Sequence, residues 1–138
     1  MIELAAICLA MNIYFEARSE PIGGQIAVAQ VTMRRANNNK ENICGVVLAN
    51  KQFSWANGKT SKKGGVIIAA FEAPKDKAAW AKAKKVANMT MKKKIWDNSN
   101  GATHYHAKFY RGKRLKPKWS KTMIKVAVVG NHIFYKNA

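Results

Sequence analysis

The chain has 138 residues, of which 48% are hydrophobic and four are tryptophan, so it can fold as one domain with its own core. Twenty-five Lys and Arg against seven Asp and Glu give a net charge of +18, which implies a polyanionic partner: nucleic acid, anionic lipid or an anionic cell-wall polymer. Two cysteines exclude a disulfide framework, although Cys8 and Cys44 can pair, and no run reaches the roughly 18 to 20 apolar residues of a membrane span.

The first predicted element is a helix over residues 2–19. Its apolar residues are too numerous for one narrow stripe, so the helix should be buried on most sides, with Glu16 in the core or at its edge. Pro21 ends the helix, which places Glu16 and Glu20 at the negative end of the helix dipole. Burial, the like charge and the dipole all disfavour ionisation of Glu16, and a general acid needs a protonated carboxyl. The alternative is a pair of surface glutamates with Arg18 as a partner.

A turn at residues 23–24 and a second buried helix over residues 25–35 follow, closed by the basic pair Arg34–Arg35. Residues 43–49 form a short apolar run. The next segment contains Gln52, Phe53, Ser54 and Trp55. Two large aromatic residues between turn residues are typical of a cleft wall, although a loop pinned to the core explains them equally well.

Residues 59–65 predict an exposed loop, and residues 66–73 a short apolar segment. Asp76 can cap a helix that runs to about Thr90 and buries Trp80. The lysines of this helix form mainly its solvated face.

From Gly101 the pattern changes to period two, which predicts a strand with Thr103 and Tyr105 on one face and His104 and His106 on the other. A turn at residues 111–113, a loop or edge with Pro117 and Trp119, and strands over 124–129 and 132–135 around a turn at 130–131 complete the chain. The predicted fold is a single α+β domain over residues 1–138, mainly helical, with a small β element.

His104 and His106 on one strand, with His132 elsewhere, can bind zinc, can hydrogen-bond a polar substrate, or can simply pack. We favour the last two, because no cysteine or acidic ligand is evidently near them. The sequence contains no glycine-rich phosphate loop and no evident Ser-His-Asp set. The lysine runs with scattered aromatic residues leave open a basic nucleic-acid-binding module, although they form no known reader motif.

Several motifs, in order along nearly the whole chain, resemble those of the SleB/CwlJ-type cell wall hydrolases, which include spore-cortex-lytic enzymes and phage lysis proteins. The motifs are residues 14–21, residues 24–29, residues 52–55, residues 102–107 and residues 130–135. The resemblance implies a lysozyme-like fold whose small antiparallel β element lines a glycan cleft. It implies Glu16 as the catalytic residue and Glu20 as a supporting one, with no metal or cofactor. The residues expected to bind substrate are Gln52, Phe53, Ser54, Trp55, Thr103, His104, Tyr105, His106 and Trp119. The chain departs from the family at Ser19, often Gly, and at Arg34, often Asn.

One carboxylate is enough for a lytic transglycosylase, whereas the usual hydrolase needs two, and Glu20 lies on the same side of the bond as Glu16. We therefore expect a monomeric lytic transglycosylase of peptidoglycan, and keep a muramidase, a glucosaminidase or an amidase as alternatives. The basic surface is expected to bind anionic wall polymers or outer-membrane lipid, and no specific nucleic acid. The first residues resemble no signal peptide. The expected setting is a phage endolysin, made in the bacterial cytoplasm and released to the cell wall through a holin.

Overall fold

The computed structural model describes residues 3–49 and 74–138. The predicted cleft wall at residues 52–55, the loop at 59–65 and the apolar segment at 66–73 therefore lie outside the described residues. The elements are α1 (Leu4–Ala17), α2 (Ile22–Arg35), α3 (Ile43–Leu48), α4 (Lys77–Met91), β1 (His104–Ala107), β2 (Phe109–Tyr110), β3 (Lys113–Arg114), β4 (Met123–Val129) and β5 (His132–Asn137). Short 3₁₀ helices cover Lys40–Asn42 and Lys118–Thr122. The predicted α+β, mainly helical fold is confirmed.

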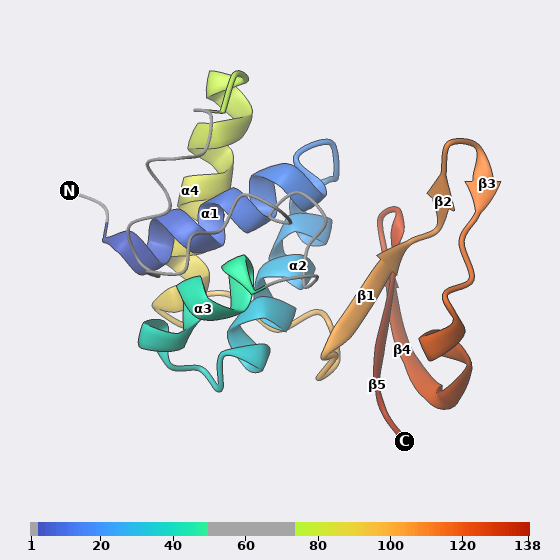
Figure 1. The fold of residues 1–138 in the computed structure, drawn as a ribbon. Coiled ribbons are helices and arrows are strands. Elements are labelled where there is room, and N and C mark those ends of the chain that lie inside the picture. The colour runs from blue at the N-terminus through green and yellow to red at the C-terminus, as the bar shows by residue number, and fades with distance from the viewer. Residues whose placement is uncertain (1–2, 50–73) are drawn as a thin grey trace.

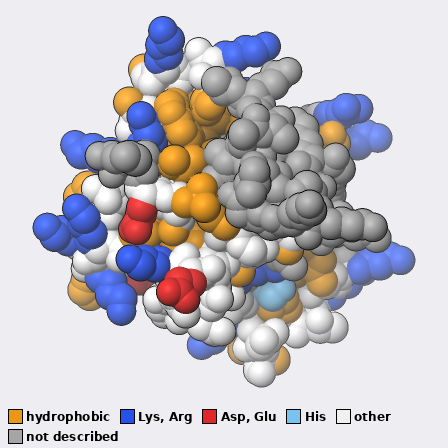
Figure 2. All heavy atoms as spheres, turned by 60° about the vertical axis from the view of Figure 1, so that its left-hand side comes forward, with side chains coloured by type: hydrophobic (Ala, Val, Ile, Leu, Met, Phe, Trp, Pro, Cys, Tyr) orange, Lys and Arg blue, Asp and Glu red, His pale blue; other side chains and the backbone are white. Residues whose placement is uncertain are grey.

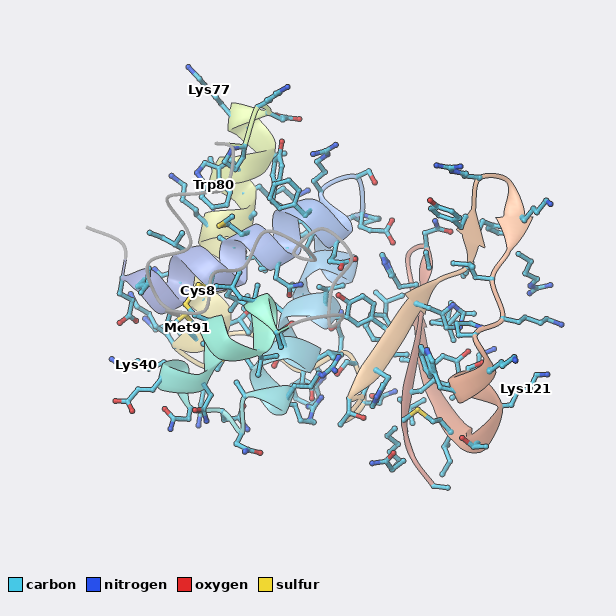
Figure 3. The ribbon with its side chains drawn as sticks, in the orientation of Figure 1. Cys8, Lys40, Lys77, Trp80, Met91 and Lys121 are labelled. Carbon is cyan, nitrogen blue, oxygen red and sulfur yellow. A yellow bond between two sulfur atoms is a disulfide. The ribbon has the colours of Figure 1, made fainter. Side chains whose placement is uncertain are left out.

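Helix α1 is the centre of the helical part, and α2, α3 and α4 pack around it (Figure 1). Nine of its 14 residues are buried, as the apolar residues on all its sides predict. Tyr14 packs edge-on against Trp80 of α4, with ring centroids 6.1 Å apart. Asp76 caps α4 by accepting a hydrogen bond of 3.0 Å from the Ala79 N–H, whereas Lys77 extends away from the helix (Figure 3). The predicted start of this helix is therefore confirmed.

The prediction of a turn at residues 23–24 was wrong, because α2 begins earlier, at Ile22. Pro21 occupies the N-cap position, and both glycines belong to the first turn of the helix. A Cβ atom on Gly24 would lie only 3.0 Å from the Glu20 Cβ. Gly24 is thus required by the close approach of Glu20 rather than by a reversal of the backbone.

The sheet has the order β1–β5–β4 and is antiparallel throughout. The predicted first strand is divided at Lys108. The Lys108 N–H still donates to the Asn131 carbonyl in the β4–β5 turn, and beyond it β2 leaves the sheet and forms a separate hairpin with β3. The turn of this hairpin has positive φ at Arg111 (51°) and Gly112 (78°), as two-residue hairpin turns require. The predicted turn at 130–131 joins β4 to β5, with φ 56° at Gly130.

A second apolar cluster joins the helices to the sheet. It contains Ala17 of α1, Val28 and Val31 of α2, and Phe134 of β5 among its buried members, and Tyr105 packs against both this cluster and the main helical core. A polar pin supports the same contact. The Arg34 guanidinium pairs with Asp97 and donates to the Ser99 hydroxyl and the Ala102 carbonyl.

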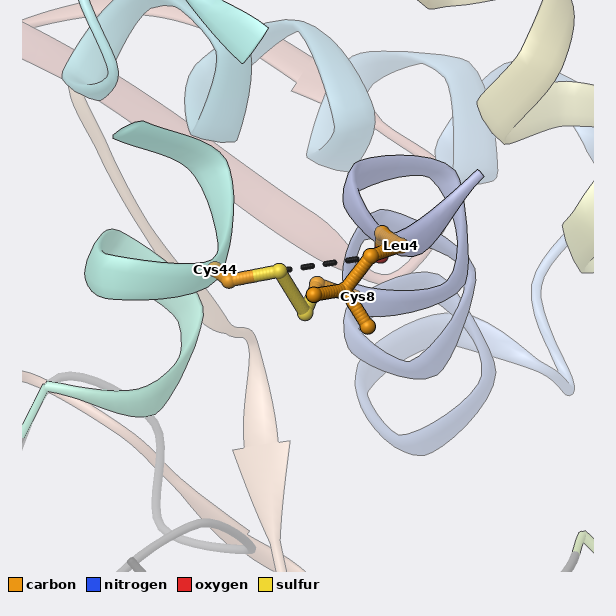
Figure 4. The surroundings of a disulfide bond; sticks show 3 residues. All are labelled: Leu4, Cys8 and Cys44. Atoms are coloured by element: carbon orange, nitrogen blue, oxygen red, sulfur yellow. Dashed lines mark hydrogen bonds between the residues drawn. A yellow bond between two sulfur atoms is a disulfide. The ribbon is translucent and has the colours of Figure 1, made fainter. Parts of the chain in front are cut away.

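The Cys8 and Cys44 side chains form a disulfide that ties α1 to α3, which settles the pairing that the sequence left open (Figure 4). The Cys44 sulfur also lies 3.6 Å from the Leu4 carbonyl oxygen. The two Cα atoms are 5.3 Å apart. The bond therefore fixes a short helix to the centre of the helical part.

Lys and Arg side chains project around the outline of the face that Figure 2 shows, with few acidic side chains among them. None of the helices that the structure describes is long and apolar enough to cross a membrane.

Candidate functional site

Glu16 lies in the last turn of α1, at the place that the sequence predicts. Its side chain is half-buried, and burial raises the pKa of its carboxyl from 4.5 to about 7. Burial is the cause of this shift, whereas the sequence also suggested the charge of Glu20 and the helix dipole. A group with this pKa can donate and accept a proton near neutral pH.

Arg18 does not partner Glu16 as the alternative interpretation of the sequence required. Its guanidinium lies over the Tyr14 ring, 4.9 Å from the centroid. Among the described residues, Glu16 is thus partly buried at the helix end rather than held in a surface ion pair with Arg18.

Tyr105 of β1 is the sheet residue whose phenol lies in the electrostatic neighbourhood of Glu16. Burial, followed by the negative charge of Glu16, raises the pKa of this phenol well above its ordinary value, while Asn12 and Arg35 act in the opposite direction. The phenol therefore keeps its proton near neutral pH. Asn12 is fully buried in α1 and accepts a hydrogen bond of 2.6 Å from Thr32 of α2, which fixes its orientation.

Arg35 brings a positive charge to this neighbourhood from the end of α2. Burial lowers its pKa, and its charge in turn supports burial in lowering the pKa of His104. Arg35 also lines a hollow of about 500 Å³ between α2 and α3. The residues that line the hollow are Arg35, Asn37, Glu41, Asn42, Gly45, Val46 and Ala49.

Glu20 connects the α1–α2 junction to the β4–β5 turn. Its Oε1 accepts hydrogen bonds of 2.6 Å from the Asn131 N–H and 2.8 Å from Nδ1 of His132. Gly130 leaves room for this carboxylate, since a Cβ there would lie 3.0 Å from the same oxygen. With a side chain only 10% exposed and its oxygen engaged by the turn, Glu20 acts as a latch between helices and sheet.

His106 and Trp119 lie on the opposite side of β1 from Tyr105, because successive residues of a strand face opposite ways. Trp119 lies against the rings of His104, His106 and Tyr135, with centroids 5.4 to 5.7 Å apart. Both ring nitrogens of His106 are hydrogen-bonded, Nδ1 to the Ala107 carbonyl and Nε2 to the Tyr135 hydroxyl. His106 is thus held inside the sheet.

The structure therefore brings one predicted substrate-binding residue, Tyr105, beside Glu16. His104 is half-buried near Arg35, and its Nδ1 lies 2.9 Å from the Thr103 hydroxyl. The predicted residues 52–55 lie outside the described part. Asn12 and Arg35 were not predicted for the site, although a buried polar residue one helical turn before Glu16 was a signal for the first.

Among residues 3–49 and 74–138, no three His, Cys, Asp or Glu side chains gather as metal ligands. The other carboxylates of this part have different surroundings. Asp97 pairs with Arg34, Glu3 with Lys40, Asp76 caps α4, Glu20 is the latch, and Glu41 is exposed beside the hollow. Glu72 lies outside the described residues.

A family model described as "Cell Wall Hydrolase" matches residues 19–135. The matched segment includes Glu20 and begins three residues after Glu16. Among solved structures, the chain is similar to the catalytic domain of the Bacillus cereus SleB protein. The two share 23% identity and a TM-score of 0.61, over 99% of this chain and 93% of that one, which establishes a common fold. None of the curated proteins compared with the chain matches it.

Proposed function

The chain belongs to the cell wall hydrolase family, and on this basis we propose that it degrades peptidoglycan with Glu16 as its catalytic acid. The family predicted from the sequence motifs is confirmed. The half-buried carboxyl of Glu16, with its pKa raised to about 7, is the observation that carries the proposal. A carboxyl with an ordinary pKa would hold too little proton near neutral pH to protonate a leaving sugar.

We assign a lytic transglycosylase reaction to this site. Glu16 protonates the glycosidic oxygen between N-acetylmuramic acid and N-acetylglucosamine, and the bond to C1 breaks. The carboxylate then takes the proton of the C6 hydroxyl as this oxygen closes on C1. The product is a 1,6-anhydro sugar, no water is consumed, and Glu16 recovers its proton.

The surroundings of the other described carboxylates support a mechanism with one carboxylate. Two-carboxylate hydrolases need the second group across the bond from the first. Glu20 is nearest to Glu16 in sequence, but its Oε1 is held by Asn131 and His132. Asp97 is likewise paired with Arg34.

Tyr105 and Arg35 have supporting roles in this proposal. The phenol of Tyr105 stays protonated and can donate a hydrogen bond to substrate or to the Glu16 carboxylate after proton transfer. The hollow that Arg35 lines can hold part of the glycan beside the Arg35 side chain. We place the activity in phage lysis, as an endolysin, a setting that suits a net charge of +18 because anionic wall polymers or lipid would retain the protein.

Mass spectrometry of digested peptidoglycan tests the reaction. We expect muropeptides that end in 1,6-anhydromuramic acid, one water lighter than hydrolysis products. A Glu16→Gln digest, processed identically, is the control for anhydro ends already present in the substrate. Reducing muramic acid ends would instead establish a muramidase, reducing glucosamine ends a glucosaminidase, and free stem peptides an amidase.

A further inference from the structure

The positive charge of the sheet region is not balanced by any acidic residue. From Asn98 to the C-terminus the sequence has nine Lys and Arg and no Asp or Glu. All of these residues lie in the described part of the chain, and Lys121, for example, points away from the sheet (Figure 3). An anionic surface approaching this region therefore meets no repulsive charge from these residues.

The hairpin of β2 and β3 combines this charge with exposed aromatic rings. Phe109 and Tyr110 are 51% and 59% exposed. They pair across the hairpin with Arg114 and Lys113, respectively, and the Arg111 guanidinium lies 5.3 Å from the Tyr110 ring centroid. The hairpin projects beyond β1 and away from the helices (Figure 1).

Nothing in the described structure buries these rings deeply, although a two-stranded ribbon has marginal stability without a packed face. Phe109 and Tyr110 together retain a large exposed aromatic area, which favours a partner that removes it from water. The three cations of the hairpin and its turn favour an anionic partner. A soluble polyanion satisfies the charges alone, whereas an anionic bilayer offers phosphate groups and, just beneath them, the interfacial layer that aromatic side chains prefer.

We propose that the β2–β3 hairpin is a docking surface for membranes of anionic phospholipid. The rings of Phe109 and Tyr110 enter the interfacial layer, and Arg111, Lys113 and Arg114 lie at the level of the phosphates. This contact lies apart from the catalytic residue and goes beyond the proposed reaction. It would hold the enzyme at the membrane that borders the cell wall.

Cosedimentation of the full chain with phosphatidylglycerol vesicles tests the proposal, with phosphatidylcholine vesicles as the uncharged reference. Phe109→Ser with Tyr110→Ser should reduce the partition coefficient at least about tenfold, since it removes the apolar contact. Arg111→Gln with Lys113→Gln should reduce it about 25-fold, at roughly fivefold for each cation near the bilayer. Circular dichroism and digestion of isolated cell walls should be unchanged in both variants.

Matched variants elsewhere decide whether the hairpin itself makes the contact. Ile124→Ser with Val128→Ser removes similarly exposed apolar side chains from β4, and Lys82→Gln with Lys85→Gln removes exposed cations from α4. Both should bind within about twofold of the unaltered protein, since screened charges act only at short range. Equal losses in these controls would overturn the proposal, as would full binding by either hairpin variant. A loss of binding on Trp96→Ser alone, at the most exposed aromatic residue of the described part, would also overturn it by moving the contact to the α4–β1 loop.

Discussion

The helical region and the sheet region are held together by different means. Around α1, apolar side chains from all four helices form one core, and a disulfide joins α1 to α3. The sheet is thin: β2, β3 and β4 contain no buried residue, and burial is concentrated in β5 and at His106 of β1. The sheet is attached by the Phe134 cluster, the Arg34 pin and the Glu20 latch.

This difference shows which region can tolerate a destabilising buried carboxyl such as that of Glu16, the proposed catalytic acid. A half-buried carboxyl with its pKa raised to about 7 lowers stability whenever it is ionised, and Glu16 belongs to the region with the larger core. Tyr105 comes from the thin sheet, so its position depends on the contacts that attach the sheet. The helices therefore supply the proposed acid, and the attachment of the sheet completes its surroundings.

The largest expected effect is that of Glu16→Gln on activity. The amide keeps the shape but cannot donate the proton, so clearing of a cell-wall suspension should slow about a thousandfold. For the unaltered protein, the activity should fall as the pH rises through about 7, because the carboxyl loses its proton there. Glu3→Gln, an exposed substitution outside the hollow, is the control and should retain full activity.

Glu16→Gln should also make the folded protein more stable at alkaline pH. The folded protein holds the Glu16 proton up to about pH 7, while the unfolded chain releases it near pH 4.5. The contribution of Glu16 to stability is therefore highest below pH 4.5 and declines until about pH 7. Removing the titration should raise the free energy of unfolding near pH 8 by about 3 kcal/mol, with no gain near pH 4. Urea denaturation at both pH values measures this. Ordinary activity, or equal stability near pH 8, would contradict the assignment of Glu16.

The second effect tests how far the helical region depends on its disulfide. Replacing Cys8 and Cys44 by Ala removes a link across 36 residues of sequence and should lower the free energy of unfolding by about 4 kcal/mol. Denaturation with and without reductant measures the change. A reductant should destabilise the unaltered protein similarly and leave the double variant unaffected. An unfolding curve that does not respond to reductant would show that the helical core suffices without the bond.

The sequence predicted those parts of the fold that depend on local signals. The burial of α1, the cap at Asp76, and the turns predicted at residues 111–113 and 130–131 all follow from periodicity and turn chemistry, although Lys113 itself begins β3. The prediction from sequence failed where a tertiary contact determined the local structure. Gly24 indicated a turn, but its role is to let Glu20 lie against α2, and nothing local reveals that contact.

The candidate site was predictable to the same extent. The position of Glu16 at a buried helix end follows from the α1 pattern and Pro21. Arg35 joins the site only because α2 ends beside β1, and the sequence explained it as a favourable charge at a helix C-terminus. His106 is predicted to bind substrate, and its Nδ1 contact with the Ala107 carbonyl is local. Its Nε2 contact with the Tyr135 hydroxyl depends on the register of β1 with β5, which the sequence does not reveal.

The smallest expected effect separates two roles for Glu20. If its charge kept Glu16 protonated, Glu20→Gln would lower the pKa of Glu16 and shift the alkaline limit of activity to lower pH. Because burial is what raises that pKa, we expect the limit to stay near pH 7.

Glu20→Gln should instead loosen the latch, since an amide accepts more weakly from Asn131 and His132, and should lower the free energy of unfolding by about 1 to 2 kcal/mol. Amide hydrogen exchange should accelerate at the β4–β5 turn and not in α4, and activity should fall several-fold as Tyr105 loses its fixed position. A shifted pH limit with unchanged exchange would show that Glu20 acts on the acid directly and that the sheet is attached without it.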